Sequence, residues 1–201
     1  MLPDFEPRLR AFAEVIVRVG LNLQPGQRLL IAEPYELQGV ARSAEVIVEA
    51  VIKAAATDAE VIWGDGPRLR EFAEKADWRG FSQLAAGNAR RLSDGVRRGD
   101  ALLFLQSSQP RLLDGVPAER IAELRRIGWD HFGPVAQQLV QGATNWTAAP
   151  APIPAWAHAA YPDLPSEGRL AALWQDVFTA TRVNEPSPGA AWKLHLRLLQ
   201  R

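Results

Sequence analysis

Ala101-Leu102-Leu103-Phe104-Leu105 is the clearest strand of the sequence and decides the fold. The run is short, apolar throughout and entered from Gly99-Asp100, which is typical of a strand buried on both faces of a parallel sheet. The run Leu29-Leu30-Ile31-Ala32 has the same character and follows a turn at Pro25-Gly26. We therefore expect a sheet that is covered by helices on both sides.

Segments with helical periodicity separate the apolar runs. We predict strands at residues 29–32, 60–63, 101–105 and 145–149, and helices at residues 5–19, 37–56, 67–76, 79–98 and from Pro117 to about Gln141, the last with a break near Gly133-Pro134 left open. Asp4 is placed to cap the first helix, and Asp65 or Gly66 precedes the helix that starts at Pro67. Alternating strands and helices predict an α/β fold of the Rossmann-like three-layer type, with a mainly parallel sheet of about four strands.

The composition changes at Pro150. Seven of the 15 prolines lie within residues 150–201. We predict an α/β core at residues 1–149 and a Pro-rich extension with helices at residues 150–201. The last predicted helix, opened by Ser187-Pro188, is still in its apolar pattern at Arg201. This suggests that the chain is part of a longer protein. A natural C-terminal helix docked on the domain is the alternative.

Composition also excludes several classes of protein. Lys plus Arg and Asp plus Glu both number 23, so no net charge attracts nucleic acid or an anionic membrane surface. The sequence contains no cysteine, which excludes disulfides, thiolate catalysis and Cys-ligated metal sites. The N-terminus lacks the pattern of a signal peptide, and no apolar run approaches the roughly 20 residues of a membrane-spanning helix. We expect a cytoplasmic protein that binds neither nucleic acid nor membranes.

Motifs for catalysis are incomplete. Ser107-Ser108 follows a predicted strand but lacks the flanking glycines of a nucleophile elbow. Gly64-Asp65-Gly66 resembles the start of a dinucleotide-binding fingerprint, but Leu69 replaces its third glycine. The three histidines stand far apart in the sequence and form no metal-binding pair: His131, His158 and His195.

Two acidic residues directly follow predicted strands. Glu33 follows the strand at 29–32, and Asp65 follows the strand at 60–63. Ligands of parallel α/β sheets usually bind beyond the carboxyl ends of the strands, and a Glu and an Asp can act as acid and base. Glu33 and Asp65 are therefore the candidate binding residues. Helix capping and solvent exposure are the alternative explanation of both.

An ordered series of short motifs runs along the chain. The first is Val19-Gly20-Leu21-Asn22-Leu23-Gln24-Pro25-Gly26-Gln27. The others follow Pro150: Ala151-Pro152-Ile153-Pro154-Ala155-Trp156-Ala157, Tyr161-Pro162-Asp163, Leu173-Trp174-Gln175-Asp176-Val177-Phe178, Thr181-Arg182-Val183-Asn184 and Ala190-Ala191-Trp192-Lys193-Leu194-His195. In this order and spacing, nearly the whole chain resembles the N-terminal domain of the thermophilic-type metalloaminopeptidases, the family of aminopeptidase T and aminopeptidase S. Ile153 and Asn184 depart from the family's pattern, which has Thr and Asp there.

The resemblance implies a role that depends on a second domain. Enzymes of this family remove N-terminal residues from peptides with two divalent metal ions, of zinc, cobalt or magnesium type. Glu, His, Tyr and Asp side chains of the C-terminal half hold these ions. The resemblance therefore implies that this chain carries no catalytic residue, metal ligand or cofactor and is inactive alone. It would be a scaffold that packs on the C-terminal catalytic domain and contributes to a homodimer, with peptide bound only by the full-length enzyme.

Two other hypotheses stay open at this point. The chain could be a freestanding α/β domain that binds a small molecule at Glu33 and Asp65. It could also be a truncated relative that acts as a dimerisation or interaction module. Trp156, Trp174 and Trp192 would then cover a surface for another domain or subunit, whereas a place in the core is the simpler explanation of these side chains.

Overall fold

The sheet of the molecule is parallel throughout. The computed structural model describes residues 2, 4–33 and 39–199, and within them the strand order is β2-β1-β3-β4. The strands are β1 (Leu29–Ala32), β2 (Ala59–Val61), β3 (Ala101–Gln106) and β4 (Trp146–Pro150). Each neighbouring pair runs in the same direction. The predicted α/β class with a parallel sheet of four strands is confirmed.

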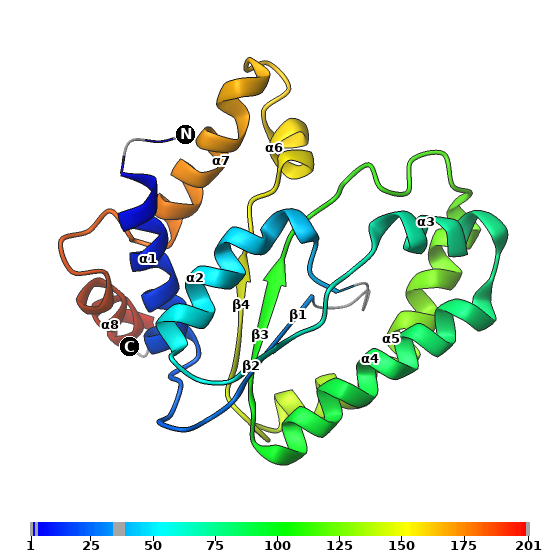
Figure 1. Cartoon of the computed structure of the whole chain (residues 1–201), viewed down its shortest axis with the longest axis horizontal. Helices are drawn as coiled ribbons and strands as arrows, with labels where there is room; N and C mark the ends of the chain where they lie inside the picture. Colours follow the sequence, from blue (N-terminus) through cyan, green and yellow to red (C-terminus); the bar gives the residue numbers. More distant parts are fainter. Residues whose placement is uncertain (1, 3, 34–38, 200–201) are drawn as a thin grey trace.

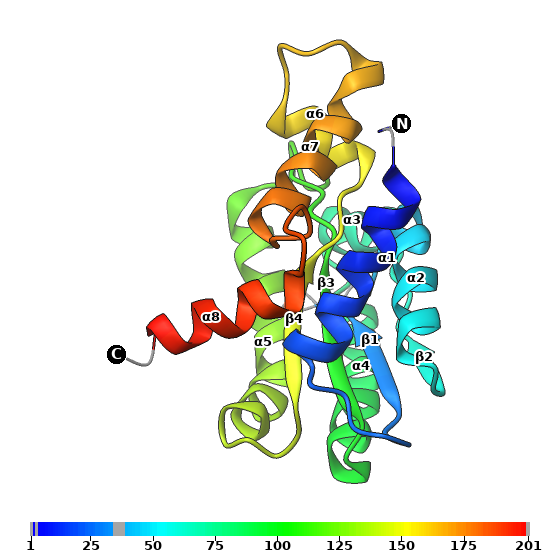
Figure 2. The same cartoon turned by 90° about the vertical axis from the view of Figure 1, so that its left-hand side faces the viewer.

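Helices cover both faces of this sheet (Figure 1). The helical elements are α1 (Phe5–Val15), a π-helical turn η1 (Ile16–Gly20), a 3-10 turn η2 (Arg42–Ala44), α2 (Glu45–Ala55), α3 (Gly66–Lys75), α4 (Trp78–Arg98), α5 (Ala118–Val140), α6 (Pro154–Ala160), α7 (Ser166–Ala180) and α8 (Pro188–Leu199). α1 packs beside α2, and α4 packs beside α5, on opposite sides of the strands (Figure 2).

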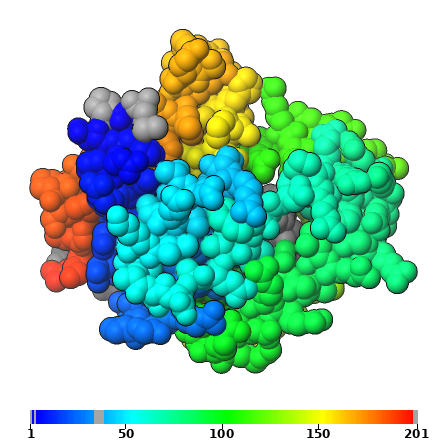
Figure 3. Space-filling model, viewed as in Figure 1, coloured from blue at the N-terminus to red at the C-terminus, as the bar shows by residue number. Residues whose placement is uncertain are grey.

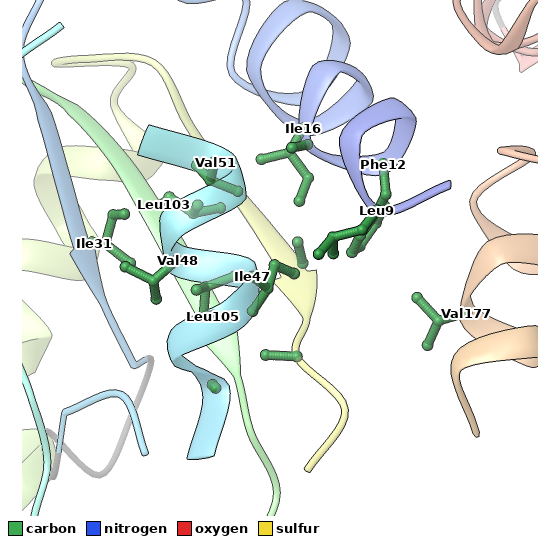
Figure 4. Close-up of a cluster of buried hydrophobic side chains, with 14 of the residues drawn as sticks. Leu9, Phe12, Ile16, Ile31, Ile47, Val48, Val51, Leu103, Leu105 and Val177 are labelled. Atoms are coloured by element: carbon green, nitrogen blue, oxygen red, sulfur yellow. The ribbon is translucent and has the colours of Figure 1, made fainter. Parts of the chain in front are cut away.

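The apolar run of β3 explains this layered arrangement. Successive side chains of a strand point to opposite faces, so an all-apolar strand needs a core on each side. Leu103 and Leu105 belong to the buried cluster under α1 and α2, whereas Leu102 and Phe104 belong to the cluster under α4 and α5. Figure 4 shows the first cluster, in which Leu9 and other residues of α1 and α2 surround the side chains of β1 and β3.

The C-terminal helices share the first core. Trp174 and Phe178 of α7 are buried, and their ring centroids lie 5.2 Å apart. The rings of Phe5 in α1 and Trp174 are nearly perpendicular, and their centroids lie 5.3 Å apart. At the surface of α7, the Tyr161 hydroxyl donates a hydrogen bond to Asp176, which raises the pKa of Tyr161. The boundary expected after residue 149 falls within the last two residues of β4, and the division into two parts stays a prediction.

One predicted helix start is wrong, and one predicted capping hydrogen bond is not made. Residues 39–41 are not helical, because Val40 forms a β-bridge with Trp63 and donates its N–H to the carbonyl of Ile62 at 2.8 Å. The start of that predicted helix, at residues 37 and 38, lies outside the described residues. Asp4 stands at the N-terminus of α1 with φ 59°, a left-handed conformation, and its side chain makes no capping hydrogen bond.

The break near Gly133-Pro134 does not occur, because α5 runs through Pro134 without interruption. Proline removes one backbone N–H and usually disfavours a helix interior. Here Pro134 is exposed to solvent, while its neighbours Phe132 and Val135 are buried against the sheet. The burial of these neighbours holds both halves of the helix on one core.

Among the described residues, no helix is long and apolar enough to span a membrane.

Candidate functional site

The carboxyl ends of the strands meet at one edge of the sheet, because all four strands are parallel. The chain leaves β1 for β2 on one side and returns as β3 on the other side of β1, so the strand order reverses between β1 and β3. Ligands of open α/β sheets usually bind at such a point. The residues that follow β1 and β3 are Glu33 and Ser107, which are 6% and 1% exposed.

A hollow of about 480 Å³ opens at this edge of the sheet, between η2, the end of β2 and the start of α3. Figure 3 shows the surface hollowed between the segment around α2, in cyan, and the segment of α3. The Arg42 guanidinium lies over the Trp63 ring at 4.5 Å from its centroid, a cation–π contact that forms one wall. The lining residues include Arg42, Ser43, Trp63, Asp65, Gly66 and Gln109.

Asp65 lies in the wall of this hollow and caps α3. Its Oδ1 accepts a hydrogen bond from the backbone N–H of Arg68 at 3.1 Å, and Pro67 occupies the first turn of the helix. The side chain is exposed to solvent. Helix capping, the simpler explanation proposed from the sequence, therefore accounts for Asp65.

Glu33 is buried, which excludes one of the alternative explanations that the sequence allowed for this residue. Solvent exposure does not explain this residue, because only 6% of its surface is accessible. Ser107 is also buried, and its Oγ accepts a hydrogen bond from the N–H of Ala41 at 3.3 Å. That bond ties the end of β3 to the segment before η2. The structure thus places Glu33 and Ser107 in the interior at the strand ends, whereas Asp65 lies at the surface.

An Asp65→Ala variant tests the capping role. We expect the free energy of unfolding to fall by about 1 kcal/mol, because the N–H of Arg68 loses its acceptor. Urea denaturation followed by circular dichroism measures this loss. The control is Asp65→Asn, which keeps an oxygen at the capping position and should lie within about 0.5 kcal/mol of the wild type. Equal stability of all three proteins would show that the cap contributes nothing.

The described residues offer no group that could hold a metal ion. No three His, Asp or Glu side chains of the described ranges converge on one point. Each histidine lies on a different helix and has a different neighbour: His131 meets Ser82, His158 meets Arg169, and His195 meets Arg182. Two of these neighbours are guanidinium cations, which repel a divalent metal ion.

Sequence reasoning missed three residues that shape the hollow: Arg42, Trp63 and Gln109. Arg42 was expected inside a helix and Trp63 inside a strand, so neither was expected to line a site. Their contact depends on the bridge between Val40 and Trp63, which joins segments far apart in the sequence. The run Gly64-Asp65-Gly66-Pro67 was the one local signal for this region.

Comparison with known proteins gives a consistent set of matches. The sequence model of the family described as thermophilic metalloprotease (M29) matches residues 5–201. Aminopeptidase T from Thermus thermophilus is 32% identical over 195 residues, which are 97% of this chain and 47% of the relative. Aminopeptidase AmpS from Bacillus subtilis is 28% identical over 194 residues, which are 96% of this chain and 47% of the relative.

Structural comparison agrees with the sequence matches. The solved structure of wild-type AmpT from Thermus thermophilus superposes with a TM-score of 0.80 at 30% sequence identity. The match covers 96% of this chain and 47% of that chain. The chain spans about half the length of the curated relatives it matches.

Proposed function

The chain belongs to the thermophilic metalloprotease family (M29), and from this premise we propose that it is the N-terminal scaffold domain of a metal-dependent aminopeptidase. In this proposal the full-length protein hydrolyses N-terminal residues from peptides. The match of nearly the whole chain to about half of each relative carries the proposal, because it leaves room for a second domain of similar size. A cytoplasmic location and a homodimer belong to the same proposal.

The chemistry of the described residues supports the proposal that this chain is a scaffold and that catalysis belongs to a second domain. Two-metal hydrolysis needs several carboxylate and imidazole ligands at one place. The described ranges contain no such group, and two of the three histidines lie against arginines. We therefore assign the two divalent metal ions, of zinc, cobalt or magnesium type, and the peptide to the C-terminal domain. The residues described here supply a rigid layered platform on which that domain packs.

The activity of the 201-residue chain tests the scaffold role. We expect hydrolysis of leucine p-nitroanilide at the rate of the buffer blank, with or without zinc, cobalt or magnesium, because the ligands needed for two-metal chemistry do not converge. The comparison protein is the full-length polypeptide, which should show metal-dependent hydrolysis. Metal-stimulated activity of the chain alone, lost when His131, His158 and His195 are all changed to Ala, would contradict the proposal.

The hollow beside Asp65 favours a second candidate function, the binding of a small molecule. Its volume of about 480 Å³ lies in the range of ligand pockets, and its walls combine an arginine, an aromatic ring and a carboxylate. A metabolite screen for compounds that raise the melting temperature of the chain tests this function. If the chain binds a small molecule there, the compound should no longer raise the melting temperature of the Asp65→Ala or the Glu33→Ala variant. A rise in melting temperature that persists in both variants would count against this function.

A further inference from the structure

The outer edge of β4 has no strand beside it within the described residues, because β4 is the last strand in the order. The N–H of Ala151 donates to the carbonyl of Gln106 in β3 at 2.9 Å. In a parallel pair, alternate residues direct both backbone groups toward the same neighbour. The N–H and C=O groups of Trp146 and Ala148 therefore point away from β3. An edge of this kind can pair with another strand.

Three hollows meet at Ala148, which is exposed although it lies in the middle of a strand. One of about 150 Å³ lies on the α5 side of β4, where Phe104 and Phe132 line it. One of about 200 Å³ lies on the α1 side, where Ile16 and Trp192 line it. The third, of about 450 Å³, lies at the carboxyl end of the strand. An added strand would direct alternate side chains into the first two hollows, because successive side chains point to opposite faces.

Exposed apolar side chains lie on β4 and on two helices that adjoin it, α5 and α8. Of the eight large apolar side chains that are exposed among the described residues, six lie on β4, α5 and α8: Trp146, Trp129, Val140, Leu194, Leu196 and Leu198. Figure 2 shows α8 projecting from the side of the molecule on which β4 and α5 lie. Trp192, near the start of α8, and Ala148 of β4 line one hollow, so α8 adjoins the edge of the strand at this residue. A surface of this composition is typical of an interaction site.

We propose that the β4 edge receives an additional β-strand, with alternating apolar side chains, from the half of the family's polypeptide that this chain does not match. The proposal rests on the proposed function. More than half of each relative lies outside the match, so the family's chain is long enough to supply the strand. Main-chain hydrogen bonds to Trp146 and Ala148 would fix its register, and the two face hollows would select apolar side chains.

Hydrogen exchange of two amides, one in β4 and one directly after its last residue, tests the proposal. The N–H of Ala151 is bonded to β3 and serves as the internal reference, whereas the N–H of Ala148 points outward. In the 201-residue chain we expect Ala148 to exchange at least about 100-fold faster than Ala151. In the full-length protein we expect the two rates to lie within about 10-fold of each other. Fast exchange of Ala148 in a full-length protein with metal-dependent peptidase activity overturns the proposal and leaves the proposed function intact.

A charged substitution at the edge provides a matched pair of variants. Ala148→Lys should leave the melting temperature of the 201-residue chain unchanged, because the residue is exposed there. In the full-length protein it should speed the exchange of the Trp146 amide at least about 10-fold, because a buried lysine opposes strand addition. Val46→Lys, on α2 and 40% exposed, is the control and should change neither quantity. Equal exchange rates of the Trp146 amide in the two variants overturn the proposal. Protection of the Ala148 amide that rises with the concentration of the 201-residue chain also overturns it, because a second copy of the chain would then cover the edge.

Discussion

A Phe178→Ala variant is expected to lose about 3–5 kcal/mol of the free energy of unfolding. Phe178 has no exposed surface, and its ring lies 5.2 Å from that of Trp174 and 6.2 Å from that of Phe12. Removal of the ring leaves a cavity between α1 and α7 that rigid neighbours cannot fill. The loss should therefore exceed that of any surface substitution.

Urea denaturation followed by circular dichroism measures this effect without relying on the fluorescence of Trp174. The control is Leu194→Ala, which removes a side chain that is 60% exposed and should change stability by less than about 0.5 kcal/mol in the chain alone. A loss below about 1 kcal/mol for Phe178→Ala would mean that α7 contributes little to the core, contrary to the packing seen here.

A Gly39→Ala variant should lose about 2–6 kcal/mol of the free energy of unfolding, from backbone strain and overpacking together. Gly39 has φ 83°, a left-handed conformation that disfavours a side chain. A Cβ atom there would lie 2.5 Å from the backbone N of Gly64 and from the carbonyl carbon of Trp63. Backbone atoms cannot rotate away, so the bridge between Val40 and Trp63 would have to move.

Gly26→Ala is the matched control for this substitution. Gly26 has φ 76°, almost the same conformation, but no atom lies within 4 Å of the position of its Cβ. We expect a loss of about 1 kcal/mol, from conformation alone. Thermal unfolding of both variants separates strain from steric contact. Equal melting temperatures for the two variants would show that the close approach at Gly39 does not constrain the fold.

The strands could be predicted where burial on both faces of the sheet requires every residue of the strand to be apolar. β1 matches its apolar run to the residue, and β3 extends one residue beyond its run, to Gln106. β2 is less well predicted, because Trp63 leaves the sheet to bridge Val40. That bridge forms between segments separated by more than twenty residues, and no local pattern encodes it.

The candidate site was predictable only in part, for a similar reason. The capping role of Asp65 follows from a local sequence in which an aspartate precedes glycine and proline. The burial of Glu33 and the stacking of Arg42 on Trp63 depend on how distant segments meet. Which strand lies at the edge of the sheet also depends on chain topology, so the sequence of β4 does not reveal its open side.

We propose that this chain is the scaffold half of a metal-dependent aminopeptidase. The most direct test is the intact mass of the protein expressed from its native gene, together with its hydrolysis of leucine p-nitroanilide with and without added divalent metal. We predict a mass about twice the 22.1 kDa of this chain, since the match covers 47% of each relative, and activity that requires the metal. A mass of 22.1 kDa, or a larger protein without metal-dependent activity, would contradict the claim.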